Sequence, residues 1–496
     1  VAFPRLNALS YWLFLAGGLL LTSSFLFGGA PDAGWFAYAP LTEQQFSPDR
    51  NMDFYVLSLL MLGVSSMAAA LNFFVTIINM RAPGMTMFRL PVFVWMTMVI
   101  SALLILALPV LTVALLQLLF DRHYETNFLL AGGGGDPLLW QHLFWIFGHP
   151  EVYVLILPAM GIVSETLPVF SRKPLFGYRA IVFAGIAIAF LGWAVWSHHM
   201  FVTGLGPVQK SIFAGTTFAI GVPTGIKIFN WLATMYGGNI RFTTSMYFAV
   251  SFIALFTIGG ISGVMHASPP VDTQQSDTYW IVAHLHYVLV GGSVQGIFSG
   301  IYYWFPKMTG RLLSESLGKL NFWLMFIGIN MTFFPMHFLG TAGMPRRIYT
   351  YDSAMGWDLW NLVATMGAFV LSTGILVFVV NFFRSMRQEP TAPNNPWDAP
   401  TLEWATTSPP PEHDFDVIPV IRDRDPLWYD RDHGIEPPEP PASVHIHMPP
   451  PSYYPVMMGL GALLLAIGPM THLAITALGL PVIIYSIWGW ALEPTD

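Results

Sequence analysis

Long apolar segments constrain this chain more than any other feature of its sequence. Ten apolar segments precede residue 386, and each is at least as long as the roughly 20 residues that a transmembrane helix needs. They lie near residues 8–28, 52–80, 92–120, 137–168, 178–203, 212–238, 242–265, 279–305, 319–340 and 358–385. Two more, 453–471 and 473–492, are joined by a very short turn. We therefore predict an all-α, polytopic membrane helix bundle with about ten core transmembrane helices and a C-terminal transmembrane hairpin.

The composition supports a membrane protein and excludes several kinds of site. Only 10% of the 496 residues are charged, whereas soluble domains carry about 25%. A net charge of −7 offers no basic surface for nucleic acid. With no cysteine, the chain itself has no disulfide, no c-type heme attachment and no thiolate metal centre. Its 14 histidines make imidazole the expected metal ligand.

The distribution of basic residues predicts how the helices are oriented in the membrane. The basic loop residues of one side are Arg5, Arg81, Arg89, Arg172, Lys173, Arg179, Arg241, Lys307, Arg311, Lys319, Arg384 and Arg387; those of the other are Arg50, Arg122, Lys210, Arg346 and Arg347. The positive-inside rule places the richer set in the cytoplasm.

Residues 386–452, rich in proline and acids, predict an extended cytoplasmic linker between a membrane core, 1–385, and a two-helix extension, 453–496.

One apolar stretch, 140–158, contains His149, Glu151 and Tyr153 within five residues. An acid in hydrocarbon costs about 3 kcal/mol on insertion scales, so such residues mark proton transfer or pairing. Residues four apart share a helix face, so His149 and Tyr153 point the same way and Glu151 points elsewhere. The simpler interpretation is a transmembrane helix with a few polar residues. The histidines further along the chain favour the interpretation that these polar residues have a function.

His198 and His199 follow each other at the end of the segment 178–203. Adjacent helical residues point about 100° apart, so both can reach one metal only at a distortion or a helix end. A lone histidine pair is more often structural. Together with His149, however, the pair makes three imidazoles, a set suited to copper or zinc.

Two further pairs of polar residues lie inside apolar segments. His284 and His286 are two residues apart and therefore face opposite sides of a helix, which suits two separate heme irons better than one ion. Thr224 and Lys227 share one face. A lysine in the middle of a membrane segment is a candidate proton relay. The alternative is that Lys227 extends its side chain to the membrane surface.

Several motifs resemble a known family and occur in its order. They are AFPRLN, GHPEVY, WSHHMF, PTGIK, AHLHYV and GMPRR, followed by LEWATTSPPP near residue 410. With them the sequence resembles subunit I of the heme-copper terminal oxidases, in the class with the GHPEVY motif. By this resemblance His149, His198 and His199 would ligate copper B, and the catalytic Tyr153 would be covalently linked to His149.

The resemblance also implies heme sites. His284 would ligate the high-spin heme and His286 the low-spin heme, both expected to be heme A, with heme O as the alternative. Arg346 and Arg347 would pair with the heme propionates. Asp277 would lie at the outer magnesium site.

Two proton pathways follow from the same resemblance. Glu151 would end one pathway, which Asn7 would line. Lys227 would line the other, with Thr224 on the same helix face. Lys227 would supply protons while the metal centre is reduced, and Glu151 would supply those consumed or pumped after oxygen binds.

The sequence departs from the family pattern at several points. The family normally has two more helices before AFPR, which carry the second axial histidine of the low-spin heme and the entrance aspartate of the first pathway. We expect a further segment or chain to supply them. Ser276 replaces the usual magnesium-site histidine, Leu285 a common phenylalanine, and Ala187 a lysine-pathway serine. The hairpin after 453 resembles a fused accessory subunit.

The function implied by the resemblance is the reduction of oxygen to water with proton pumping, in a bacterial cytoplasmic membrane. Electrons would come from cytochrome c or a c-type domain through a copper A-bearing subunit II, and a subunit III-like partner is expected. A quinol oxidase is the near alternative. A nitric oxide reductase would need extra carboxylates, and the Glu151–Tyr153 pair argues against it. A transporter that binds substrate with Glu151 and Lys227 is the most distant alternative.

Overall fold

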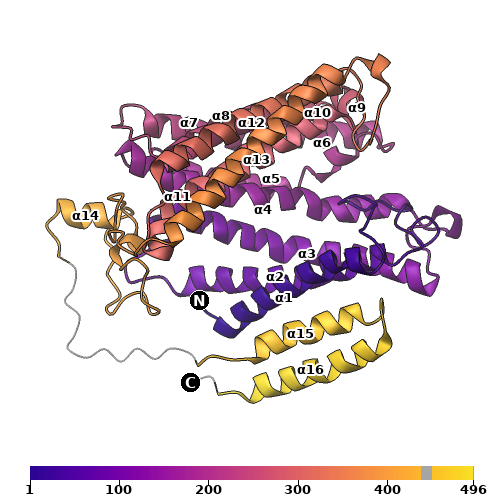
Figure 1. Ribbon diagram of the computed structural model, residues 1–496, viewed down its shortest axis with the longest axis horizontal. Helices are drawn as coiled ribbons and strands as arrows, with labels where there is room; N and C mark the ends of the chain where they lie inside the picture. Colours follow the sequence, from indigo (N-terminus) through magenta and orange to yellow (C-terminus); the bar gives the residue numbers. More distant parts are fainter. Residues whose placement is uncertain (437–449, 495–496) are drawn as a thin grey trace. The chain divides into compact units, whose positions relative to one another are not determined.

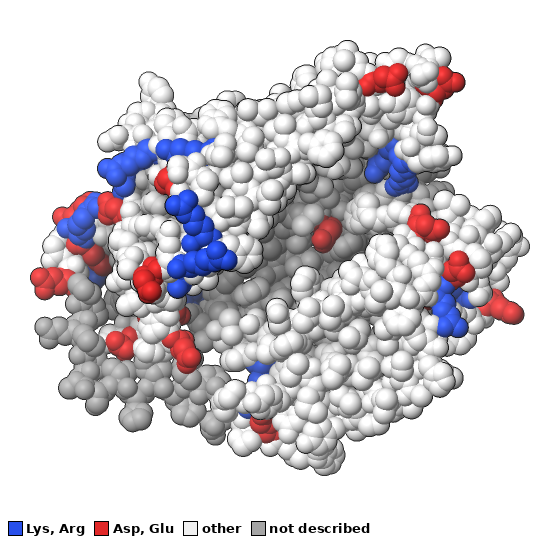
Figure 2. Space-filling view, in the orientation of Figure 1, with Lys and Arg blue, Asp and Glu red and all other residues white. Residues whose placement is uncertain are grey.

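The structure is helical and confirms the predicted fold class. It is a computed structural model that describes residues 1–436 and 450–494. In that part, ten helices are long and apolar enough to cross a membrane, and no β-strand is formed. Nine of the ten match predicted core segments, and the tenth is Leu473–Leu492. Charged residues are sparse on the face seen in Figure 2, as expected for helices that contact lipid.

The chain folds into two compact units. Among the described residues, the first comprises 1–81, 97–154 and 450–494, and the second comprises 82–96 and 155–436. Helices α3 (Val92–Tyr124) and α4 (Pro137–Ser171) contribute residues to both units. The three predicted segments, 1–385, 386–452 and 453–496, stay a prediction. Residues 437–449 of the predicted linker lie outside the described residues.

The first unit is built on the packing of its first two helices. These are α1 (Pro4–Ser23) and α2 (Asn51–Asn79), and the C-terminal hairpin of α15 (Tyr454–Ile467) and α16 (Leu473–Leu492) lies along α1 (Figure 1). Buried side chains from both ends of the sequence form one apolar core: Leu9, Leu13, Ala16, Leu20, Phe54, Met61 and Met470. The last described residues also return to the first helix, because Arg5 forms an ion pair of 3.3 Å with Glu493.

The second unit contains the remaining helices. They are α5 (Tyr178–Gly192), α6 (Pro207–Ala219), α7 (Gly221–Met235), α8 (Thr244–His266), α9 (Pro269–Gln275), α10 (Tyr279–Val288), α11 (Gln295–Thr309), α12 (Glu315–Thr341), α13 (Asp358–Met386) and α14 (Pro426–Asp432). The long helices α12 and α13 run side by side (Figure 1). Aromatic side chains fill the core between α8, α11 and α12, with Phe248 stacked on Tyr302 at 5.8 Å.

Three predicted helices are interrupted. Segment 178–203 is wrong as a single helix, since α5 ends at Gly192 and the 3₁₀ helix η4 (Trp196–Met200) follows. Segment 212–238 breaks at Ile220. Pro223 has no N–H for the carbonyl of Ala219 and its ring would clash there, so α6 cannot continue into α7. Segment 279–305 contains one π-helical turn, η5 (Leu289–Val294).

The described part of the predicted linker packs on the second unit. Trp397 and Trp404 both donate indole N–H groups to Tyr303, at 2.8 Å to its carbonyl and 3.0 Å to its hydroxyl. Lys307 at the end of α11 donates to the carbonyl of Thr406 at 2.8 Å. These contacts fix residues near 400 against the helix ends that the positive-inside rule places in the cytoplasm.

Candidate functional site

The two adjacent histidines lie in a short 3₁₀ helix, which is the distortion of the α-helix that the sequence predicted. His198 and His199 belong to η4, and their Nε2 atoms are 3.1 Å apart. A 3₁₀ turn follows α5 because Trp193 and Ala194 bond back to the carbonyls of Phe190 and Leu191, which tightens the helix end. Two Nε2 atoms so close together can contact one ion.

A threonine that the sequence analysis missed fixes the ring of His198. Nδ1 of His198 lies 3.0 Å from the hydroxyl oxygen of Thr217 on α6. That hydroxyl donates its only hydrogen to the carbonyl of Phe213. Thr217 must therefore accept from Nδ1–H, which leaves the lone pair on Nε2, the atom that faces His199. A threonine in an apolar helix is too common for the sequence to single it out.

His149 and Tyr153 lie together on one face of α4, as predicted. Their ring centroids are 4.6 Å apart and the rings are tilted by 59°. His149 is buried, with 5% of its surface exposed. Glu151, between them in sequence, projects from another face of the helix. All three belong to the first unit.

His284 and His286 face different neighbours across α10. Nδ1 of His284 lies 3.0 Å from the carbonyl of Gly259 and 2.9 Å from the hydroxyl of Ser262, both on α8. The ring of His286 stacks on Phe333 of α12 at 4.3 Å. Its Nδ1 lies 2.8 Å from the carbonyl of Val282. In both rings the backbone engages Nδ1, so Nε2 is the nitrogen available to a metal.

Lys227 is completely buried in the second unit, so it does not extend to the surface. Its Nζ lies 3.2 Å from the sulfur of Met96, at the start of α3. Thr224 is one turn away on the same helix, and its hydroxyl donates to the carbonyl of Ile220 at 3.0 Å. Both residues thus lie inside α7 as predicted, with no charged partner within ion-pairing distance among the described residues.

Asn7 belongs to a polar stripe between α1 and α2. Asn72 donates to its side-chain oxygen at 3.3 Å, and Ser65 donates to the carbonyl of Ser10 at 2.6 Å. Ser58, Ser65 and Asn72 are all buried and follow each other at intervals of seven residues. That interval places them on one helix face, and it is the sequence signal that could have found them.

The loop before α10 and the loop after α12 bring the predicted site residues Asp277 and Arg346 together. Thr278 and Pro345 form a β-bridge, and the amide of Arg346 donates to the carbonyl of Asp277 at 2.9 Å. Arg346 and Arg347 therefore lie at the end of the helix that carries His284 and His286. The side chain of Asp277 is exposed. Its role at a magnesium site stays a prediction.

Comparison with known proteins gives a consistent result. Residues 1–370 match the family described as cytochrome c and quinol oxidase polypeptide I. The chain is 50% identical over 485 residues to cytochrome c oxidase subunit 1 of Bacillus subtilis, covering 97% of this chain and 78% of the relative. It is 51% identical over 465 residues to that of Alkalihalophilus pseudofirmus, covering 93% and 74%.

A solved structure shares the fold. It is described as a heme-copper terminal oxidase dimer and aligns with a TM-score of 0.62 at 21% identity. The alignment covers 77% of this chain and 70% of that one.

Proposed function

The chain belongs to the cytochrome c and quinol oxidase polypeptide I family, and from this premise we propose which of its residues carry out the chemistry. It is the catalytic subunit of a terminal oxidase, an integral multi-pass membrane protein that couples oxygen reduction to proton transport. When bound, heme iron and copper supply the electron transfer and the binding of oxygen. The roles of its own residues follow.

Copper B is held by His149, His198 and His199. The observation that carries this proposal is the turn of η4, which brings the Nε2 atoms of His198 and His199 within 3.1 Å. Imidazole nitrogen suits copper, and the hydrogen bond to Thr217 holds His198 in the tautomer that a metal needs. His149, from the GHPEVY motif, is the third imidazole ligand of this proposed copper site.

The hemes, which we propose to be heme A, are held from α10. His284 holds the high-spin heme and His286 the low-spin heme. Both rings fit this role because backbone carbonyls at 2.8–3.0 Å engage Nδ1 and leave Nε2 for iron. A further segment or chain would supply the second ligand of the low-spin heme. Arg346 and Arg347 pair with the propionates, and Asp277 would hold a magnesium ion.

Tyr153 supplies a proton and an electron to oxygen at the metal centre. Its ring lies 4.6 Å from the ring of His149, between centroids, so the side chains are close enough for the proposed covalent link between them. Tyr153 is therefore held in place by its neighbour on the same helix face.

Two routes deliver protons. Asn7 and the stripe of Ser65 and Asn72 line the first route, which ends at Glu151. Lys227 and Thr224 line the second. The complete burial of Lys227 supports this role, because a buried amine exchanges its proton only through nearby hydroxyls and water.

The partners follow from what this chain lacks. It has no cysteine, so a copper A centre lies on a subunit II that receives electrons from cytochrome c or a c-type domain. A quinol donor is the alternative. A subunit III-like chain completes the complex, and the membrane is the bacterial cytoplasmic membrane.

Replacement of His198 or His199 by Ala tests this proposal. We expect copper B to be lost and oxygen reduction abolished, while the low-spin heme stays reducible in the optical spectrum. Normal turnover with full copper occupancy in either variant would end the assignment. A purified protein without any Soret band would instead favour the transporter.

A further inference from the structure

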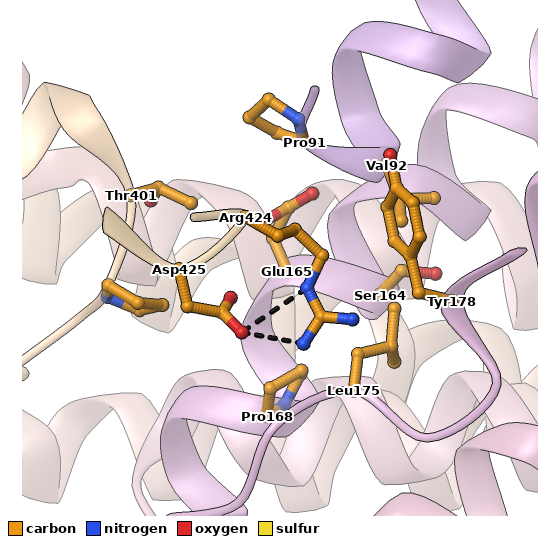
Figure 3. Close-up of a pocket in the computed structure, with 11 residues that line it drawn as sticks. Pro91, Val92, Ser164, Glu165, Pro168, Leu175, Tyr178, Thr401, Arg424 and Asp425 are labelled. Atoms are coloured by element: carbon orange, nitrogen blue, oxygen red, sulfur yellow. Dashed lines mark hydrogen bonds and ion pairs between the residues drawn. The ribbon is translucent and has the colours of Figure 1, made fainter. Parts of the chain in front are cut away.

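Glu165, near the end of α4, has no part in the proposed function, yet it lines a small cavity in the second unit. The cavity has a volume of about 20 Å³, which is enough for one water molecule. Ser164, Tyr178 and Thr401 line it together with Glu165 (Figure 3). Glu165 is partly exposed. Its Oε1 accepts the amide N–H of Phe93 at 3.1 Å, at the start of α3.

The cavity lies at the helix ends that the positive-inside rule places in the cytoplasm. Its outer wall includes Arg424 and Asp425, from the segment that follows the membrane core. Their side chains are joined by hydrogen bonds of 2.6 and 3.2 Å (Figure 3). The guanidinium of Arg424 also lies 5.1 Å from the ring centre of Tyr178. A charged pair and an aromatic ring therefore line the cavity.

Lys227 lies one turn of α3 further into the membrane. Glu165 contacts the amide of Phe93, and Nζ of Lys227 contacts the sulfur of Met96 at 3.2 Å. Three residues correspond to about 4.5 Å along a helix axis. Glu165 and Lys227 therefore contact neighbouring turns of α3.

Helices α4 and α5 pack closely against this part of α3 and against Lys227. A Cβ added to Gly161 on α4 would lie 2.8 Å from Cα of Phe93, and one added to Gly185 on α5 would lie 3.3 Å from Nζ of Lys227. The thioether of Met96, a flexible side chain, lies against Gly185 and beside Lys227. On α7, Trp231 is one turn from Lys227 and donates to the hydroxyl of Ser164 at 3.0 Å. Ser164 thereby connects the wall of the cavity to the helix of Lys227.

We propose that Glu165 collects protons from the cytoplasm and passes them, through water in the cavity and past Met96, to Lys227. This proposal rests on the proposed role of Lys227. The competing role is structural, since a carboxylate that accepts an amide at a helix N-terminus stabilises that helix by itself. An experiment must therefore remove the acid but keep the hydrogen bond.

Glu165→Gln does this, because its amide oxygen still accepts the N–H of Phe93 but cannot release a proton. In the complete oxidase we expect anaerobic reduction of the high-spin heme, followed by stopped flow, to slow by about tenfold or more. Proton uptake in that step, followed with a pH-sensitive dye, should slow in parallel. The reaction of the fully reduced enzyme with oxygen should keep its rate. Glu165→Asp keeps an acid and should retain most of the rate.

Glu315→Gln is the matched control. Glu315 also accepts an amide at a helix start, that of Thr244 at 2.9 Å, but does not line the cavity. It should leave the reduction rate unchanged. Equal rates for Glu165→Gln and the native enzyme, with a slow Lys227→Met variant, would overturn the role of Glu165 alone. If Lys227→Met also reduces normally, the proposed role of Lys227 fails with it. If Glu165→Gln does not assemble, a native rate for Glu165→Asp alongside a slow Glu165→Ser supports the proposal, and equal rates overturn it.

Discussion

At the scale of single residues, one hydroxyl determines which nitrogen of His198 faces a metal. Thr217→Val removes the acceptor of Nδ1–H but keeps the shape of the side chain. We expect the affinity for copper to fall by about 10–100-fold, as is typical when an orienting partner of a metal ligand is lost. Copper content after dialysis against a graded chelator series measures this.

Thr217→Ser is the matched control for that substitution. It keeps the hydroxyl at Oγ and should bind copper nearly as the native protein does. If the valine and serine variants lose copper equally, the hydrogen bond to His198 does not orient the ring.

Glu43 is a second residue with a testable property. It lies in the loop between α1 and α2, with 1% of its surface exposed. Burial, and then the nearby Asp121, raise the pKa of its carboxyl to about 7 from an ordinary value of 4.5. Arg122 acts in the opposite direction, but its guanidinium is already bonded to Asp53 at 2.8 Å. Glu43 therefore holds a proton that the unfolded chain would release.

The sign of the pH dependence follows from this difference. Between pH 4.5 and about 7 the folded state binds more protons at Glu43 than the unfolded state, so stability falls as pH rises through this range. Glu43→Gln should remove that part of the slope in thermal unfolding midpoints measured from pH 5 to pH 8. Glu125→Gln, at an exposed acid of the neighbouring loop, should leave the slope as it is. An unchanged slope in Glu43→Gln would contradict the assignment.

The sequence predicted the ionisable site residues inside apolar segments better than it predicted the residues that hydrogen-bond to them. His149, His198, His284 and Lys227 stand out because polar groups are costly in an apolar segment. Thr217 does not, because a threonine in a membrane helix can satisfy its own hydroxyl with a backbone carbonyl. Glu165 carried the same signal as Glu151, an acid within an apolar segment, and was nevertheless not singled out.

At the scale of helices, apolar length predicts where a span lies but not where it breaks. The break at Ile220 could have been inferred from Pro223, whose effect on the carbonyl four residues earlier is local. The end of α5 at Gly192 has no such signal, because the next four residues, 193–196, are as apolar as those before it. The 3₁₀ turn that holds His198 and His199 was therefore expected only because two adjacent histidines required a distortion.

The packing of the C-terminal hairpin on α1 gives a prediction at this scale. A Cβ added to Gly459 on α15 would lie 2.9 Å from Cβ of Trp12 and 3.1 Å from its carbonyl oxygen. Gly459→Leu should therefore push α15 off α1 and destabilise the hairpin by about 1–3 kcal/mol. Limited proteolysis of the purified complex should release the hairpin faster.

Gly18→Leu is the control for the hairpin. Gly18 lies on α1, and a Cβ there meets no atom within 4 Å. This variant should resist the protease as the native chain does. Equal resistance of the Gly459→Leu variant would show that the close contact does not hold the hairpin.

At the scale of the whole molecule, hydropathy and charge alone predicted a polytopic helical membrane protein. They could not predict that residues 450–494 join 1–81 and 97–154 in one compact unit. Lipid and neighbouring helices are both apolar, so an apolar helix face does not reveal which of them it contacts. The family motifs supplied the function, because their order along the chain is far more specific than any single spacing.

We propose that the histidines of this chain hold a heme iron and a copper ion at one catalytic centre. Infrared spectroscopy of the reduced complex with carbon monoxide, photolysed at low temperature, tests it most directly. We expect carbon monoxide to leave the heme iron and to appear on copper, with a copper–carbonyl band that is absent in the His199→Ala variant. A native complex in which photolysed carbon monoxide gives no copper–carbonyl band, or in which no heme binds the gas, would contradict the account.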